Sequence, residues 1–435
     1  MVGIIGVLVA LGLLIYLALR GINILVISVL CAAIVALANS MPLAAAIAGP
    51  YMLGLATFVQ RFFLLFLFGA IFGRIMGDSG AATSVAFALS RRLGAHNAVL
   101  IAVLACAILS YGGVNVFILV FAVYPLGLVL MKQANLPKRL LAGALALGAG
   151  TFTMTALPGT PSVQNTIPAE ALGTPLTAAP VVGIAAAVVM FALGYLYLRW
   201  QTDKAKRTGE RFVPGHADEA ASLDVDPEKL PHWAVSVIPL AVVVAVVIVT
   251  TVMKMEPAAA WVAAALAAGS LVAIVLFRRH LKGITASLGA GAANSALPVL
   301  NTAAVIGFGI TVSKVPAFTD FVRLVSGIPL PPLISAAVSV NVMAGFTGSA
   351  SGGLQIFMQT MAPDYLRLGV TPDLLHRISA VASGGLDSLP HSGAVITLLT
   401  VMGLTHREAY KDIFWVTVLV PLAALVVALA IAAAL

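Results

Sequence analysis

Apolar runs of about 20 residues recur along nearly the whole chain, and each is long enough to cross a lipid bilayer. Of the 435 residues, 61% are hydrophobic and only 9% are charged. Soluble domains carry roughly 25% charged residues, so these proportions exclude a water-soluble fold. The sequence therefore predicts an all-α, polytopic membrane protein.

We expect ten transmembrane helices. Two of the apolar runs, 43–77 and 283–313, are long and look interrupted. In the first of these, Arg61 is predicted to mark the end of a membrane-surface helix, with the span beginning at Phe62; the alternative is that Arg61 snorkels to the membrane surface. In chain order the predicted spans are 2–19, 22–39, 43–77, 139–157, 178–199, 234–253, 257–277, 283–313, 375–403 and 412–433.

Two further apolar segments, 97–131 and 329–361, are each split by a polar, glycine-rich turn. Irregular backbone at membrane depth survives only where protein or a water-filled cavity shelters it. We therefore expect two re-entrant hairpins, each entering and leaving the membrane by the same face. An ordinary kinked span is the alternative.

The basic residues indicate the orientation. With residue 1 outside, most of the 24 Lys and Arg residues fall on the inner face, as the positive-inside rule requires. The outer cations are then Lys254, Lys314, Arg323, Arg367 and Arg377. We expect a cell inner (plasma) membrane protein with both termini extracytoplasmic. The net charge of +8 then reports topology, and no nucleic-acid partner is expected.

A hydrophilic linker, 201–231, lies between five predicted spans on each side, and this odd number inverts the second half relative to the first. The first repeat, 1–200, would hold the hairpin 97–131 and a broken helix at 139–165. The second, 232–435, would hold the hairpin 329–361 and a broken helix at 375–403. Both halves show the same order of hairpin, proline-started helix and Pro-containing break.

Four polar breaks fall at membrane depth: 110–115, 151–165, 347–353 and 383–392. Inverted repeats gather such breaks near one point, where half-helix N-termini attract an anion. The alternative is that these hydroxyls bond back to helix carbonyls. The predicted substrate-binding residues are Ser110, Tyr111, Gly112, Gly113, Asn115, Thr153, Thr155, Gly159, Thr160, Gln164, Asn165, Thr347, Gly348, Ser349, Ser351, Ser388, His391 and Ser392.

Asp387 is the one acid deep in an apolar span of this topology, and His391 follows four residues later. Apolar surroundings favour a neutral carboxyl group, and histidine titrates near neutrality, so either could take up a proton. We predict that Asp387 and His391 couple transport to protons; a capping role is the alternative. Ser388 completes the residue types of a hydrolytic triad, but all three lie within one short segment, whereas triad members usually come from separate elements. No catalytic residue, and therefore no enzyme, is predicted.

No phosphate-binding loop, metal-ligand spacing or cofactor motif is present, so an ion gradient must drive transport. A proton is the expected coupling ion. Two alternatives remain: a sodium ion held around Ser110–Asn115 and Thr347–Ser351, and a channel. Because the four breaks contain no Arg or Lys, we expect a monocarboxylate.

At these same residues the chain resembles the gluconate:proton symporter family, GntP, of the ion transporter superfamily. The resemblance is carried by Gly73–Ala81, the Pro-Gly-Thr-Pro turn at 158–161, Gly348–Ala350 and Asp387–Gly393. It implies proton-coupled import of a small organic acid by a homodimer. It also implies an elevator, in which hairpins and broken helices move past a fixed scaffold.

The breaks differ from those of sugar-acid members, which carry a histidine-rich first break and Asn-Asp-Ser-Gly in the second. Here the first break has threonines and the second reads Asp-Ser-Leu-Pro-His-Ser-Gly. The turns at 111–115 and 158–165 look more like the branch for short hydroxy acids such as 3-hydroxybutyrate. Gluconate and 3-hydroxybutyrate are the leading candidate substrates.

Overall fold

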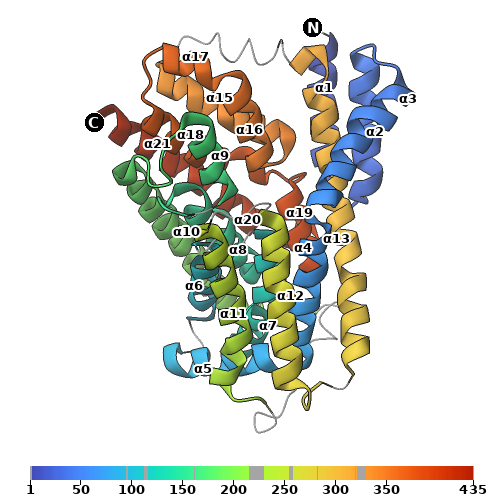
Figure 1. The fold of residues 1–435 in the computed structure, drawn as a ribbon, viewed down its shortest axis with the longest axis vertical. Coiled ribbons are helices and arrows are strands. Elements are labelled where there is room, and N and C mark those ends of the chain that lie inside the picture. The colour runs from blue at the N-terminus through green and yellow to red at the C-terminus, as the bar shows by residue number, and fades with distance from the viewer. Residues whose placement is uncertain are drawn as a thin grey trace.

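The computed structural model describes residues 2–94, 97–111, 116–160, 162–214, 230–253, 258–281, 283–318, 320 and 330–434, and within them every regular element is helical (Figure 1). Six of these helices are long and apolar enough to cross a membrane by themselves. They are Val2–Leu19, Leu43–Asp78, Pro180–Thr208, Ala260–Phe277, Ile284–Ser313 and His406–Ala434. The described chain is therefore that of a polytopic membrane protein, whereas ten spans remain a prediction.

One group of helices is built along the long helix α13 (Ile284–Ser313) and the helix that runs beside it. Helices α1 (Val2–Leu19) and α2 (Ile24–Ala38) pair at one end of the molecule, and α11 (Trp233–Val252) and α12 (Ala258–Phe277) pair at the other (Figure 1). Between the pairs, α4 (Met52–Asp78) runs along α13. The two backbones approach closely because glycines face them: a Cβ added at Gly54 would lie 3.0 Å from Gly307 Cα.

The long first-half helix departs from the sequence prediction at Arg61. Helix α3 (Leu43–Ala46), the π-helical turn η1 (Ile47–Tyr51) and α4 follow one another directly, and α4 continues through Arg61. The interruption is the π-turn around Pro50, which removes a backbone donor from the helix. The prediction of a helix boundary at Arg61 is therefore wrong, and so is the interruption expected in 283–313, where α13 is continuous.

The second group contains two pairs of consecutive helices. Helix α6 (Ala98–Tyr111) is followed by α7 (Val116–Ala134), and their connection at 112–115 lies outside the described residues. Helix α15 (Pro332–Thr347) turns back at Gly348 into α16 (Ala350–Thr360), which leads to α17 (Ala362–Arg367). Gly348 has a φ of +61°, a conformation that glycine adopts without steric cost.

Each pair leads into a broken helix. Helix α8 (Lys138–Gly150) is followed by the π-helical turn η3 (Phe152–Ala156) and by α9 (Val163–Leu172). Helix α18 (Pro372–Ser383) is followed by the short 3-10 turn η6 (Leu386–Ser388) and by α19 (Gly393–Met402). We call residues 151–162 break 1 and residues 384–392 break 2.

Of the remaining helices, α10 (Pro180–Thr208), α20 (His406–Phe414) and α21 (Val420–Ala434) pack around the two broken helices, and α5 (Ala81–Leu93) packs against α7 and α11. Helix α10 packs against α21, which continues from α20 through the π-turn η7 (Trp415–Leu419). Helix α5 carries Arg91 and Arg92 in its last turn. Large apolar side chains such as Val181 and Val188 of α10 remain exposed, as expected for a helix that faces lipid.

A charged cluster fixes the first broken helix to its neighbours. Arg139 of α8 donates from Nη1 to Asp412 Oδ2 at 2.6 Å, and from Nε and Nη2 to both carboxylate oxygens of Glu210. Tyr197 donates to the other oxygen of Asp412 at 2.8 Å. The Arg139 hydrogen bonds hold the pKa of Glu210 below its ordinary value.

Candidate functional site

The threonines of break 1 are held by the end of the helix that precedes them. Thr151 donates to Leu147 O at 2.6 Å, and Thr155 donates to Thr151 O at 3.0 Å. Thr153 lies within hydrogen-bonding distance of both Gly148 O, at 2.9 Å, and Ser110 Oγ, at 3.0 Å. These hydroxyls therefore bond back to helix carbonyls, and Thr153 also links break 1 to the end of α6.

The turn that closes break 1 is shaped by backbone hydrogen bonds. Gly159 has a φ of +83° and donates its N–H to Leu176 O at 2.9 Å. The Tyr111 hydroxyl, at the end of α6, donates to Pro158 O at 3.4 Å. Thr160 Oγ1 is buried, and no residue in the described part of the chain bonds to it. Break 1 thus presents one unsatisfied hydroxyl in its interior.

The two predicted amides of α9 differ in their surroundings. Asn165 donates from Nδ2 to Thr160 O at 2.7 Å and to Leu176 O at 2.9 Å. Its Oδ1 accepts from His376 Nε2 at 2.8 Å. Gln164 is buried, and its side chain makes no hydrogen bond to the residues that the structure describes. Asn165 therefore holds break 1 in shape, whereas Gln164 has its amide available for a ligand.

The turn between α15 and α16 places small polar groups next to break 2. Thr347 donates to Met343 O at 2.9 Å, and Ser349 caps α16 by accepting from Gly352 N. Ser349 and Ser351 are 3.2 Å apart through their hydroxyls. A Cβ added at Gly348 would lie 3.0 Å from His391 Cδ2, so this turn touches break 2 directly.

Asp387 and His391 are both buried in break 2, and their hydrogen bonds in the described structure go to different partners. Asp387 is 6% exposed, and its Oδ1 accepts from Ser388 Oγ at 2.9 Å. His391 donates from Nε2 to Gly345 O at 2.9 Å, and its Nδ1 has no hydrogen-bond partner among the described residues. The sequence thus placed both groups in one buried turn, but the histidine ring is directed to the α15–α16 hairpin.

Two side chains of α20 support break 2 from outside. His406 Nε2 lies 2.6 Å from Pro390 O, and Tyr410 donates to Ser388 O at 3.1 Å. His406 also lines a cleft of about 190 Å³ between the α1–α2 turn and the α19–α20 region. Asn301 of α13 lies in the same cleft, with its Oδ1 buried and unpartnered in the described structure.

The two breaks come together in space. A Cβ added at Gly384 would lie 2.8 Å from Thr155 Cγ2, so break 2 begins in contact with break 1. Helix α16 packs on α9, and α7 packs on α19, so the second arm of each hairpin contacts the other half. Of the predicted residues, Gly112, Gly113 and Asn115 lie outside the described residues; Ser392 is buried in break 2.

Two buried residues of the second broken helix were not among the predicted site residues. His376 and Arg377 of α18 are both fully buried. Arg377 donates from Nε to Ala178 O, from Nη1 to Ala156 O and from Nη2 to Leu176 O, at 2.9, 3.3 and 2.9 Å. The sequence counted Arg377 among the cations of the outer face, and the structure shows it buried within the protein. Its position directly before the apolar run Ile378–Ala382 was the available signal.

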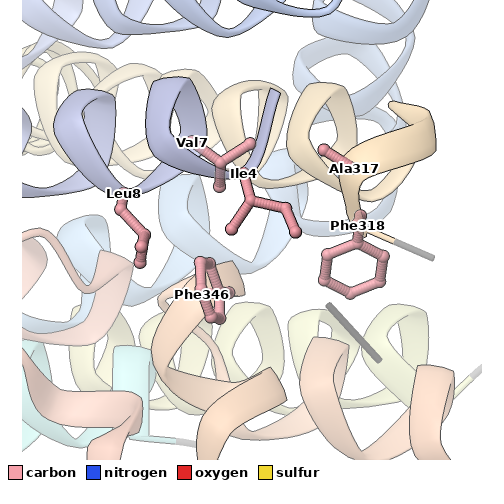
Figure 2. A pocket seen from close by; sticks show the side chains of 6 residues that line it. All are labelled: Ile4, Val7, Leu8, Ala317, Phe318 and Phe346. Carbon is pink, nitrogen blue, oxygen red and sulfur yellow. The ribbon is translucent and has the colours of Figure 1, made fainter. Parts of the chain in front are cut away.

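A small apolar crevice separates the α15–α16 turn from α1. Figure 2 shows Phe346 facing Ile4, Val7 and Leu8 of α1, with Ala317 and Phe318 beside them. The lining side chains are all hydrocarbon. Phe346, the residue before Thr347, thus faces α1 across an apolar crevice.

Comparison with known proteins agrees with this architecture. Residues 2–350 match the model of the GntP family permeases. A protein of Bacillus subtilis (strain 168) described as uncharacterized transporter YxjC is 38% identical over 452 residues, covering 95% of this chain and 95% of that protein. The Asp387–Ser388–His391 group is accordingly part of a transporter and not of a hydrolase, and the chain belongs to the GntP permease family.

Proposed function

We propose that this permease is a secondary active symporter that carries a small organic monocarboxylate together with protons. Gluconate and a 3-hydroxybutyrate-like hydroxy acid are the candidate substrates. The observation that carries the proposal is the meeting of breaks 1 and 2 around buried hydroxyls, with Thr160 Oγ1 and His391 Nδ1 unpartnered in the described structure. A substrate carboxylate would accept from the Thr160 hydroxyl, and a substrate hydroxyl would donate to His391 Nδ1.

The substrate would lie between the two breaks and the α15–α16 turn. Gln164 and Thr160 offer side-chain donors there, Nδ1 of the neutral His391 ring offers an acceptor, and Ser349 and Ser351 offer hydroxyls at the start of α16. The N-terminus of α16 adds backbone N–H groups and partial positive charge, which favour an anion. These groups suit one carboxylate and neighbouring hydroxyls.

Proton coupling is assigned to Asp387, with His391 as the second titratable group of break 2. A buried acid that can be ionised or neutral is suited to bind and release a proton during transport. The cleft beside His406 offers a route by which water reaches the far side of this turn, since His406 contacts Pro390. Nothing in this assignment requires the two groups to touch.

The proposed architecture is two inverted repeats, 1–200 and 232–435, joined by the linker 201–231. The packing supports it: the α1–α2 pair has its counterpart in α11–α12, and α4 pairs with α13. Hairpins and breaks would move as an elevator past these scaffold helices, and the apolar crevice at Phe346 suits a sliding contact. We extend the proposal to a homodimer in the plasma membrane with both termini outside; the mass of the purified complex tests the dimer.

Uptake into proteoliposomes tests the coupling ion. Liposomes with an alkaline interior and an acidic exterior should accumulate labelled 3-hydroxybutyrate or gluconate without sodium. Stimulation by a sodium gradient without any dependence on the pH gradient would overturn the proton assignment. Saturable counterflow of the label distinguishes a carrier from a channel, and competition by unlabelled hydroxy acids identifies the substrate.

Asp387→Asn should abolish accumulation driven by the pH gradient while exchange of internal for external substrate continues. Asp373→Asn is the matched control. Asp373 is exposed in the first turn of α18, the helix that precedes break 2, so its replacement should leave uptake unchanged. Full accumulation by the Asp387 variant would reduce this acid to a structural role.

A further inference from the structure

Arg377 is a permanent charge buried inside the part of the molecule that holds the breaks. Its side chain is 0% exposed, and its three nitrogens donate to three backbone carbonyls, one of which, Ala156 O, belongs to break 1. Within the described chain, no carboxylate forms an ion pair with it. Carbonyl oxygens satisfy its donors but leave the full positive charge uncompensated.

The other cations of the broken helices are balanced or distant. Arg139 bonds to Glu210 and Asp412, and the neighbouring Lys138 interacts with the charge of Glu408, so each cation of this cluster has an acidic neighbour. It lies at the start of α8, about 18 Å along the helix from Gly150 at 1.5 Å per residue. Of these cations, Arg377 is therefore the one in direct contact with break 1.

The negative charge that can balance Arg377 is the carboxylate of Asp387, on the same broken helix. Asp387 follows it in break 2, and the titratable groups around Asp387 are His391 of its own turn and His406 and Tyr410 of α20. The packed elements α15, η7 and α21 carry none, and α18 adds His376, whose ring is held between Asn165 and Thr174.

His376 is satisfied as a neutral ring. Asn165 uses its Nδ2 to donate to two carbonyls, which identifies its Oδ1 as the acceptor from His376 Nε2. The Thr174 hydroxyl, 2.6 Å from Nδ1, can then donate to that nitrogen. His376 thus adds no charge when both bonds are made, and Arg377 and Asp387 are left as the charged pair to be counted.

We propose that Arg377 is the fixed countercharge that makes transport electroneutral, with one proton carried for each monoanion. This inference rests on the proposed symport of a monocarboxylate. The empty carrier has zero net charge when Asp387 is ionised. The loaded carrier again has zero net charge, because the anion balances Arg377 while the transported proton neutralises Asp387.

The two incomplete states are charged. Anion without a proton gives −1, and a proton without anion gives +1. Moving a net charge through a low-dielectric barrier is costly, so these states cross rarely. The proton binds to the Asp387 carboxylate on one side and leaves it on the other, and no other group needs to change its charge. This exclusion of charged carrier states couples the proton flux to the substrate flux, and it needs no direct contact between Asp387 and the substrate.

The first test uses the wild-type protein in proteoliposomes, with the membrane potential set by potassium and valinomycin at a constant pH gradient. The accumulation ratio of the substrate should change less than twofold between 0 and −100 mV. A carrier that moves one net charge per cycle would change the ratio about 50-fold over the same range. Such a change would overturn the countercharge proposal while leaving symport intact; no uptake of any tested acid on a pH gradient would overturn symport itself.

Variants supply the second test, through opposite phenotypes. Arg377→Gln should lower the rate of substrate exchange more than tenfold and raise the KM, because its loaded carrier has a charge of −1. Asp387→Asn should retain exchange, because its loaded carrier is neutral, but should lose net uptake, because its empty carrier has a charge of +1. Arg377→Lys should restore a large part of the exchange by restoring the charge.

The exposed Arg367, which pairs with Asp364 at the surface, provides the control Arg367→Gln with unchanged exchange. Exchange within twofold of the wild type by folded Arg377→Gln protein would overturn the proposal. Where Arg377→Gln fails to fold, the potential measurement on the wild type can still overturn the proposal, since it uses no variant.

Discussion

Replacing Gly384 by alanine tests whether breaks 1 and 2 meet as the structure places them. The added Cβ would lie 2.8 Å from Thr155 Cγ2 and 3.1 Å from Thr155 Oγ1. Ordinary contacts between carbon atoms lie at about 3.5–4.0 Å, so one of the breaks must shift by roughly 0.7 Å or more. Overpacking of this kind costs about 1–3 kcal/mol. The φ of Gly384 is −90°, so the backbone itself accepts alanine.

The matched partner change is Thr155→Ala, which removes both crowding atoms and the bond from Thr155 Oγ1 to Thr151 O. The double variant should be more stable than the sum of the two single changes by about 1–3 kcal/mol. Gly150→Ala, where an added Cβ meets nothing within 4 Å, is the control and should keep wild-type stability. Thermal unfolding of the purified protein and substrate exchange provide the two measurements. Additive effects in the double variant would refute the contact between the breaks.

Other outcomes follow from the charged cluster and the surface. Asp412→Asn should lower the free energy of unfolding by about 3 kcal/mol, because Arg139 and its neighbours lose a buried partner. The Glu210 side chain is 39% exposed, so Glu210→Gln should lower the free energy of unfolding by only about 1 kcal/mol or less. Since the folded-state pKa of Glu210 is lowered, its contribution to the free energy of unfolding is present above its ordinary pKa of 4.5 and is lost as the pH falls through the lower folded value. The unfolding temperature of Glu210→Gln should therefore fall less than that of the wild type when the pH is lowered through this range. The predicted orientation places the exposed Val213 on the inner face and the exposed Leu368 on the outer face, so Val213→Cys and Leu368→Cys should react with an impermeant maleimide added to those respective faces. The two natural cysteines are buried and should not react. Labelling of both variants from one common face would contradict the predicted topology.

Much of the fold could be predicted because the signals are local. A helix is found in each predicted apolar segment, since the length of an apolar run and the proline or glycine that ends it act through neighbouring residues. Break 1 follows Gly150, and break 2 contains Pro390, as the sequence indicated. The misplaced boundary at Arg61 shows the limit: a single cation in an apolar helix need not end it.

The sequence by itself determined a polytopic membrane transporter with broken helices, and it picked out the acid Asp387. Only the tertiary structure decided which groups meet. Asn165 and His376 lie 211 residues apart and share a hydrogen bond, and Arg377 is buried against the carbonyls of the other half. Such pairings depend on how distant helices pack, because burial and hydrogen bonding of a side chain are properties of its neighbours in space and not of its neighbours in the chain.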